Sequence, residues 1–256
     1  MKFIYSFQSE WQKKKRSLSS WLVIVGAFFT PTIIIISRLV RSKGLAQLNS
    51  SPEFWENLWH SAWESMSIFL LPIGIILAGS LITQLEYKNN TWKQLHTTPQ
   101  KLTTIFFAKL SVIVLMMVQF LVLFAVGIYL AGVIPGLLIK GASYPTASIP
   151  YQFFAKETGK YFIDCLPIIS LQYLISLQFK NFLVPVGGGI ALWILSIAAL
   201  SWKYSYLIPY TYCSLNYLKS DSKFSSPVNI HVWAVGYFLL FSVMSYILYI
   251  TKKEKG

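Results

Sequence analysis

Charged residues are scarce in this chain. Only 12% of its 256 residues are Asp, Glu, Lys or Arg, whereas about 25% of the residues in an average soluble domain are charged. Hydrophobic residues make up 55% of the chain and aromatic residues 16%. So few charges exclude a soluble surface, and abundant Trp and Tyr are typical of the membrane–water boundary. The composition therefore predicts an all-α integral membrane protein surrounded by a lipid bilayer.

Acidic residues are rarer still. Nine Asp and Glu against 22 Lys and Arg give a formal net charge of +13. A nucleic-acid-binding protein would carry such charge as a basic stripe on a soluble fold, and no such fold is indicated here. In an apolar chain, basic residues instead hold loops on the cytoplasmic side of the membrane. We therefore expect no nucleic-acid partner.

Motifs for catalysis and for cofactors are missing. The chain has no G-x-x-x-x-G-K-[ST] sequence, so it lacks the loop that cradles ATP phosphates. Its two cysteines, Cys165 and Cys213, exclude a four-cysteine zinc site, although a disulfide between them is chemically possible. The three histidines offer no pair at membrane depth for a haem. We expect no catalytic residue, metal or cofactor in this chain.

Six apolar stretches approach the roughly 20 residues that a transmembrane helix needs. The fourth is the weakest, because Asp164 and Pro167 lie near its start. Glu64, Lys109 and Asp164 lie near span ends, where charged side chains can reach the lipid headgroups. We expect one transmembrane domain over residues 1–256, with spans at about 20–36, 62–84, 104–133, 161–178, 182–201 and 230–251.

An amphipathic helix is expected before the first span, at residues 1–16. Phe3, Ile4, Phe7 and Trp11 recur at near-helical spacing, and four consecutive basic residues follow at 13–16. A helix of this kind lies in the membrane interface with its basic end near anionic headgroups. The alternative is a frayed polar tail.

The distribution of basic residues favours cytoplasmic termini. With the N-terminus inside, 13 of the 22 basic residues fall on the cytoplasmic side. Arg38, Arg41 and Lys43, just after the first span, count against this orientation. The loop at 134–160 is expected to be irregular because it is rich in Pro and Gly, and the aromatic loop at 202–229 is long enough to dip back into the membrane.

Polar and small residues inside the spans are few. Gln119 and Gln172 lie deep in the third and fourth spans. They are either interhelical hydrogen-bond partners or residues that line a substrate path. Gly187, Gly188 and Gly189 lie in the fifth span, where small residues let helices pack closely.

The connection between the second and third spans, residues 86–109, is long and polar. Thr91 and the asparagines before it are N-cap candidates for a short helix at about 91–97, and Pro99 ends that helix. Trp92 and Leu95 share one face. A short surface helix that presents a large aromatic side chain is suited to docking a partner, and the alternative is a solvated loop.

This connection resembles the one in permease subunits of ABC-2 type exporters. There an acidic residue ends the second span, a small turn residue and Thr precede a short coupling helix, Pro follows, and Lys opens the third span. The matching residues here are Glu86, Asn90, Thr91, Leu95, Pro99 and Lys109, with Asn90 in the place of the usual glycine. Asn tolerates the left-handed conformation that glycine would adopt. The order of the predicted segments resembles the family over nearly the whole chain.

The resemblance implies a mechanism and partners. Two permeases, identical or paralogous, would pair in the bacterial cytoplasmic membrane, and separate ATPase subunits would bind ATP and Mg²⁺ beneath them. Residues 86–109, including Trp92, would carry the coupling to the ATPase. The chain's length and small loops are most like the permeases of lantibiotic-immunity and bacitracin-type peptide exporters. A non-transporting membrane anchor or assembly subunit remains the alternative, because it needs six spans but no docking helix.

Overall fold

The computed structural model describes residues 2–15, 17–41, 44–88, 101–139, 144–220 and 228–251, without the side chains of residues 2, 85–88 and 220. Every regular element in these ranges is helical. In chain order they are α1 (Lys2–Lys15), α2 (Leu18–Val40), α3 (Leu45–Asn49), α4 (Phe54–Ser65), the π-helical turn η1 (Met66–Leu70), α5 (Leu71–Lys88), α7 (Leu102–Leu138), α8 (Tyr151–Gln178), α9 (Leu183–Ala198), η2 (Ser205–Leu207), η3 (Pro209–Thr211), α10 (Tyr212–Ser220) and α11 (Ile230–Thr251).

Five helical segments of the described chain are long and apolar enough to cross a membrane. They are α2, the continuous run Phe54–Gln84 through α4, η1 and α5, then α7, α8 and α11. The predicted fifth span is α9, which has only 16 residues. At about 1.5 Å per residue it measures about 24 Å, less than the ~30 Å of bilayer hydrocarbon. The structure therefore supports five spans, and the count of six stays a prediction.

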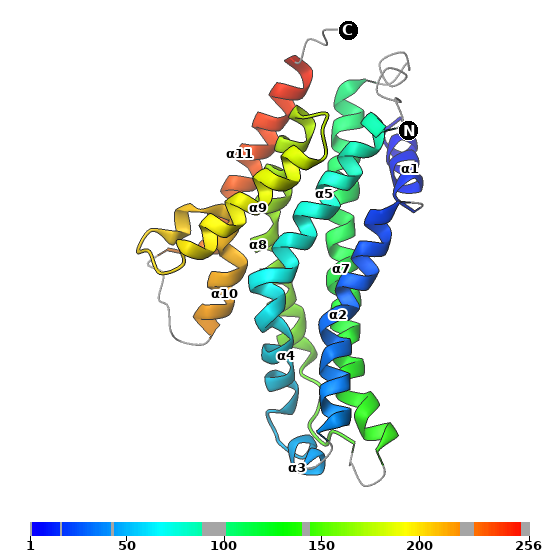
Figure 1. Cartoon of the computed structure of the whole chain (residues 1–256), viewed down its shortest axis with the longest axis vertical. Coiled ribbons are helices and arrows are strands. Elements are labelled where there is room, and N and C mark those ends of the chain that lie inside the picture. The colour runs from blue at the N-terminus through cyan, green and yellow to red at the C-terminus, as the bar shows by residue number, and fades with distance from the viewer. Residues whose placement is uncertain are drawn as a thin grey trace.

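The helices form a bundle in which α7 is the longest element, with 37 residues. It packs against α1 and α2 on one side and against α8 on the other, while α8 also packs along α11 and α5. At one end of the bundle lie α1, the end of α5, the start of α7 and the end of α11 (Figure 1). Both terminal helices are therefore at the end where the predicted coupling segment begins and ends.

Three tryptophans form one face of α4. Trp55, Trp59 and Trp63 recur every four residues, and each is at most 2% exposed. Trp63 stacks on Tyr161 of α8 with ring centroids 3.6 Å apart. Stacked aromatic pairs add to the gain from burying their area. This face explains why the helix begins at Phe54, earlier than the predicted start of the second span near residue 62.

Helix α7 continues through Pro135 to Leu138 and α8 begins at Tyr151, so the prediction of an irregular loop over residues 134–160 is wrong at both ends. A proline inside a helix leaves the carbonyl four residues earlier without its partner. Here that carbonyl belongs to Ala131, and Nη1 of Arg38 donates to it at 2.6 Å. Arg38, counted above as a loop charge, therefore completes the end of α7.

Pro72 in α5 is accommodated in the same way. In a regular α-helix the N–H of residue 72 would pair with the carbonyl of Ile68 in η1, and here Nε1 of Trp193 in α9 donates to that oxygen at 3.0 Å. In a membrane, a freed backbone carbonyl must find a partner inside the protein. Two prolines are thus tolerated because side chains from other helices satisfy the oxygens they release.

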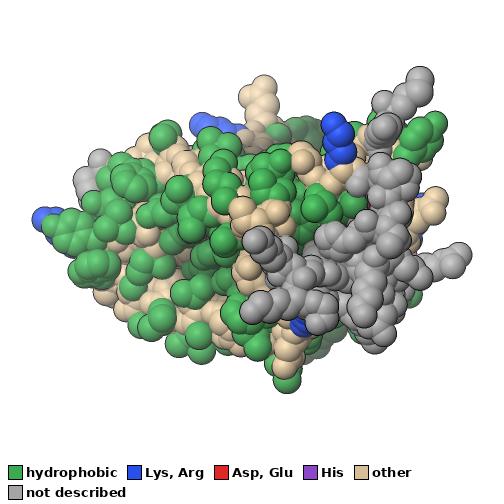
Figure 2. Space-filling model, turned by 90° about the horizontal axis from the view of Figure 1, so that it is seen from above, with side chains coloured by type: hydrophobic (Ala, Val, Ile, Leu, Met, Phe, Trp, Pro, Cys, Tyr) green, Lys and Arg blue, Asp and Glu red, His purple; other side chains and the backbone are tan. Residues whose placement is uncertain are grey.

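The segment between α9 and α11 folds back into the bundle rather than forming an open loop. Within it, η2, η3 and α10 follow one another, and Tyr210, Tyr212 and Cys213 are at most 1% exposed. Hydrophobic side chains cover much of the described surface that Figure 2 shows from the end that carries α1. On α2, Trp21, Val25 and Phe29 are 68%, 59% and 49% exposed, which suits contact with lipid tails.

Candidate functional site

The predicted coupling residues surround the junction between α5 and α7. Glu86 lies in the last turn of α5, outside the side chains that the structure describes. Asn90, Thr91, Trp92, Leu95 and Pro99 lie outside the described residues, so the predicted short helix stays a prediction. The remaining residue, Lys109, is described fully and lies two turns into α7.

The ammonium of Lys109 is buried against α1. The side chain is 2% exposed, and its Nζ lies 3.9 Å from Oε2 of Glu10, which is itself 7% exposed. Glu10 also pairs with Lys13. The prediction that Lys109 reaches the headgroups is therefore wrong. A buried charge is costly unless it is paired, and α1 brings the carboxylate that pairs with this one.

A second polar contact joins the same two helices. Nζ of Lys14 donates to Oε1 of Gln119 on α7 and lies 4.0 Å from the ring centroid of Trp11. Burial, and then the charge of neighbouring Lys15, lower the pKa of the Lys14 ammonium. Gln119 is thus an interhelical hydrogen-bond partner, which supports the first of the two interpretations of this residue.

Glu10 and Lys14 are functional candidates that the sequence interpretation missed. The sequence interpretation considered only the apolar residues of α1, as the face that contacts the membrane interface. In the structure, the residues that are nearly completely buried are Ser6, Glu10 and Lys14. Phe3 and Ile4 are exposed instead, at 44% and 58%. The spacing i, i+4, i+8 places these polar residues on one face of α1, and the contacts of Lys14 and Glu10 show that this face lies against α7. Whether α1 lies in the membrane interface stays a prediction.

The first turns of α7 also contact α8 and α11. The hydroxyl groups of Thr103 and Tyr246 on α11 are hydrogen-bonded at 2.9 Å. Tyr173 of α8 donates its hydroxyl proton to the carbonyl of Phe106 at 3.2 Å. Together with the pair formed by Lys109 and Glu10, these contacts link the start of α7 to three other helices within seven residues.

Gln172 is the centre of a second polar cluster. Its Nε2 donates to Oγ of Ser80 at 2.7 Å and to the carbonyl of Pro185 at 2.8 Å. Its Oε1 accepts a hydrogen bond from the hydroxyl of Tyr210 at 3.2 Å. These bonds join α5, α8, α9 and η3, and Gln172 is 0% exposed. The geometry supports a structural hydrogen-bonding role for this residue.

Only one of the three consecutive glycines lies at a close helix contact. A Cβ atom on Gly189 would come within 2.5 Å of Oε1 of Gln172 and 2.8 Å of Cγ2 of Ile76. A Cβ on Gly187 or Gly188 would meet nothing within 4 Å. The expected close packing of the fifth span therefore depends on Gly189.

Two further pairs lie between α8 and the last part of the chain. Asp164 is 0% exposed, and its Oδ1 lies 2.8 Å from Nδ1 of His231. The expectation that Asp164 reaches the headgroups is wrong, because a histidine partner is available inside the bundle. The Sγ atoms of Cys165 and Cys213 lie 3.4 Å apart, and both cysteines are free thiols in this structure.

Comparison with known proteins bears on the whole chain. No curated protein and no solved structure shows significant similarity to it. The profile of a family described as ABC-2 family transporter protein matches residues 6–198, from α1 to the end of α9. The multi-pass helical architecture agrees with this family of membrane transport subunits. Because the match covers most of its length, the chain belongs to the ABC-2 transporter family.

Proposed function

We propose that this chain is the permease subunit of an ATP-driven exporter in the bacterial cytoplasmic membrane. Separate ATPase subunits bind and hydrolyse ATP with Mg²⁺, and a second permease, identical or paralogous, completes the transmembrane path. The substrate is a peptide, drug or lipid-like molecule taken from the cytoplasm or the inner leaflet. The chain's length and small loops are most like the permeases of lantibiotic-immunity and bacitracin-type peptide exporters. Both termini are cytoplasmic in this proposal, which agrees with the position of α1 and the end of α11 at one end of the bundle (Figure 1).

The observation that supports coupling is the set of contacts at the start of α7. Residues 89–100 join α5 to α7, so a force applied to them acts first on these two helices. Lys109, Phe106 and Thr103 then connect α7 to α1, α8 and α11. ATP binding on a partner would thus move several helices together, as in a rigid-body switch.

Co-purification with the ATPase tests the docking function of residues 89–100. We expect Trp92→Glu and Leu95→Glu each to abolish the complex, because a charge is costly in an apolar docking contact. The controls are Trp202→Glu and Leu48→Glu. These make the same changes at described side chains that are 52% and 60% exposed and lie away from the α5–α7 junction.

The result distinguishes an exporter from a membrane anchor. Full ATPase binding by both Trp92→Glu and Leu95→Glu would show that this segment is not the docking site. If no ABC ATPase co-purifies with the wild-type protein, the permease proposal fails and the anchor or assembly subunit becomes the better interpretation. A gene for an ABC ATPase beside the gene for this chain would provide the partner to express.

A further inference from the structure

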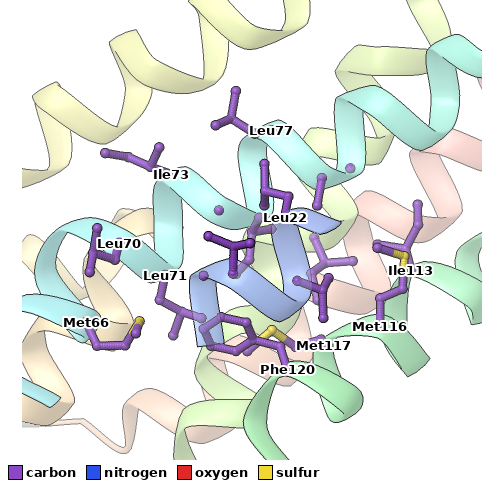
Figure 3. Close-up of a pocket in the computed structure, with 18 of the residues that line it drawn as sticks. Leu22, Met66, Leu70, Leu71, Ile73, Leu77, Ile113, Met116, Met117 and Phe120 are labelled. Carbon is purple, nitrogen blue, oxygen red and sulfur yellow. The ribbon is translucent and has the colours of Figure 1, made fainter. Parts of the chain in front are cut away.

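An apolar cavity of about 290 Å³ lies between α2, α5 and α7. Leu22 of α2, Ile73 and Leu77 of α5, and Met116, Met117 and Phe120 of α7 surround the same space (Figure 3). None of the residues that line it has a hydroxyl, amide or charged side chain. The cavity is therefore a site for an apolar group.

The cavity borders the surface that faces the bilayer. Val25 and Phe29 line it and are 59% and 49% exposed on the outer face of α2. At its inner wall, Met116 and Met117 are only 2% and 5% exposed. All three helices that form it are among the segments able to span a membrane. A ligand can thus enter sideways from the hydrocarbon layer without crossing water.

The chemistry of the lining restricts the ligand. Water needs two to four polar partners in a buried site, and an extended peptide would leave its N–H and C=O groups without partners. A hydrocarbon chain has no such groups. An engineered cavity of about 150 Å³ binds benzene, so about 290 Å³ corresponds to roughly a dozen carbon atoms. That is much of one lipid tail and less than a transmembrane helix of a second copy requires.

We propose that this cavity binds one acyl chain of a membrane phospholipid. The bilayer supplies this ligand directly at the exposed edge formed by Val25 and Phe29. The bound chain fills the space between α2, α5 and α7 and holds α2 in place against the bundle. The site is independent of ATPase docking, so either proposal can fail without the other.

Gly74 offers a way to fill the cavity without disturbing its walls. It lines the cavity, and a Cβ atom placed on it meets nothing within 4 Å. The larger side chain of Gly74→Leu therefore extends into the empty space. Gly236→Leu is the matched control. A Cβ atom on Gly236 also meets nothing within 4 Å, but this residue lies on α11 and does not line the cavity.

The test uses the full-length protein in nanodiscs of one synthetic phospholipid that carries a photoactivatable diazirine on its acyl chain. After illumination, mass spectrometry locates the adducts. We expect adducts on the buried Met116 and Met117 in the wild type and in Gly236→Leu, and their loss in Gly74→Leu. Leu239, 58% exposed on α11, reports bulk lipid and stays labelled in all three proteins.

Two outcomes would overturn the proposal. In the first, Met116 and Met117 stay unlabelled in the wild type while Leu239 is labelled, which would show that no acyl chain enters. In the second, Gly74→Leu leaves their labelling unchanged. Native mass spectrometry of the protein purified from cells identifies any amphiphile that stays bound. If such an amphiphile is not a phospholipid, and the synthetic phospholipid does not label Met116 and Met117, the cavity binds that other class of molecule.

Discussion

Nζ of Lys109 lies 3.9 Å from Oε2 of Glu10, and both side chains are almost completely buried. The two residues are far apart in the sequence but bring α1 against the start of α7. Because both charges are sheltered from water, the loss of either one removes a favourable contact that water does not replace. The pair therefore makes α1 part of the bundle at the end where the chain enters and leaves the proposed docking segment.

Replacing Lys109 tests this relationship. We expect Lys109→Met to lower the free energy of unfolding by about 1–3 kcal/mol, because the carboxylate of Glu10 keeps its pair with Lys13 but loses its buried partner on α7. Glu10→Gln should reduce that cost, so the double variant should be more stable than the sum of the single effects predicts. Thermal unfolding in detergent measures all three, with Lys156→Met, at an exposed site on α8, as the control. Additive single effects would show that the two side chains do not interact.

Arg38 and Pro135 form a second pair, in which the effect of replacing Arg38 should depend on whether Pro135 is present. We expect Arg38→Met to cost about 1.5–3 kcal/mol, because a carbonyl freed by proline loses a charged donor. In a Pro135→Ala background the helix supplies its own N–H to Ala131, so the cost of Arg38→Met should fall. Thermal unfolding of the four proteins in this cycle gives the coupling energy. An equal cost of Arg38→Met in both backgrounds would show that the freed carbonyl does not matter.

The sequence predicted the positions of the spans better than it predicted their contacts. Apolar runs are local, so α11 matches its predicted limits, and α2 and α7 begin two residues before theirs. However, α2 and α7 end four and five residues later than predicted, and the helical segments of the second and fourth spans begin eight and ten residues earlier than predicted. Arg38 was assigned to a loop because nothing near it in the sequence reveals that it reaches Ala131, 93 residues away. Pro135 was placed in the irregular loop predicted at 134–160 because only the local content of Pro and Gly was visible in the sequence.

The candidate site shows the same limit. The pattern Glu86 to Lys109 is local and could be recognised from spacing. The partner of Lys109 could not, because Glu10 precedes it by nearly one hundred residues and is separated from it by two spans. Ser6, Glu10 and Lys14 recur every four residues and form a polar face that is buried in the structure. The sequence alone does not show this burial, because a helix that presents the same polar face to water has the same pattern.

The glycines of α9 allow a prediction with a neighbouring control. Gly189→Ala places a methyl group 2.5 Å from Oε1 of Gln172 and 2.8 Å from Ile76. Gln172 is held by three hydrogen bonds and cannot move aside cheaply. We expect a loss of about 1–3 kcal/mol in the free energy of unfolding from overpacking. Gly188→Ala, which meets nothing within 4 Å, should instead be neutral or stabilise the helix by up to about 1 kcal/mol. Equal unfolding temperatures for both variants would contradict the close contact at Gly189.

Gln172 itself distinguishes a structural role from a place on the substrate path. Gln172→Leu removes the acceptor of the Tyr210 hydroxyl and the donor to Ser80, and unsatisfied buried groups cost about 1–3 kcal/mol. We therefore expect a lower unfolding temperature, while the activity of the assembled transporter per folded molecule is retained. Gln152→Leu, at an exposed site on α8, should change neither. A variant of Gln172 that keeps its wild-type stability but alters which substrates stimulate the ATPase would place this side chain on the path instead.

Gln119→Leu gives a useful comparison, because it removes the acceptor of the Lys14 ammonium at the junction of α1 and α7. Without this hydrogen bond, α1 should associate more weakly with α7. We expect faster proteolysis within residues 2–15 in Gln119→Leu than in the wild type.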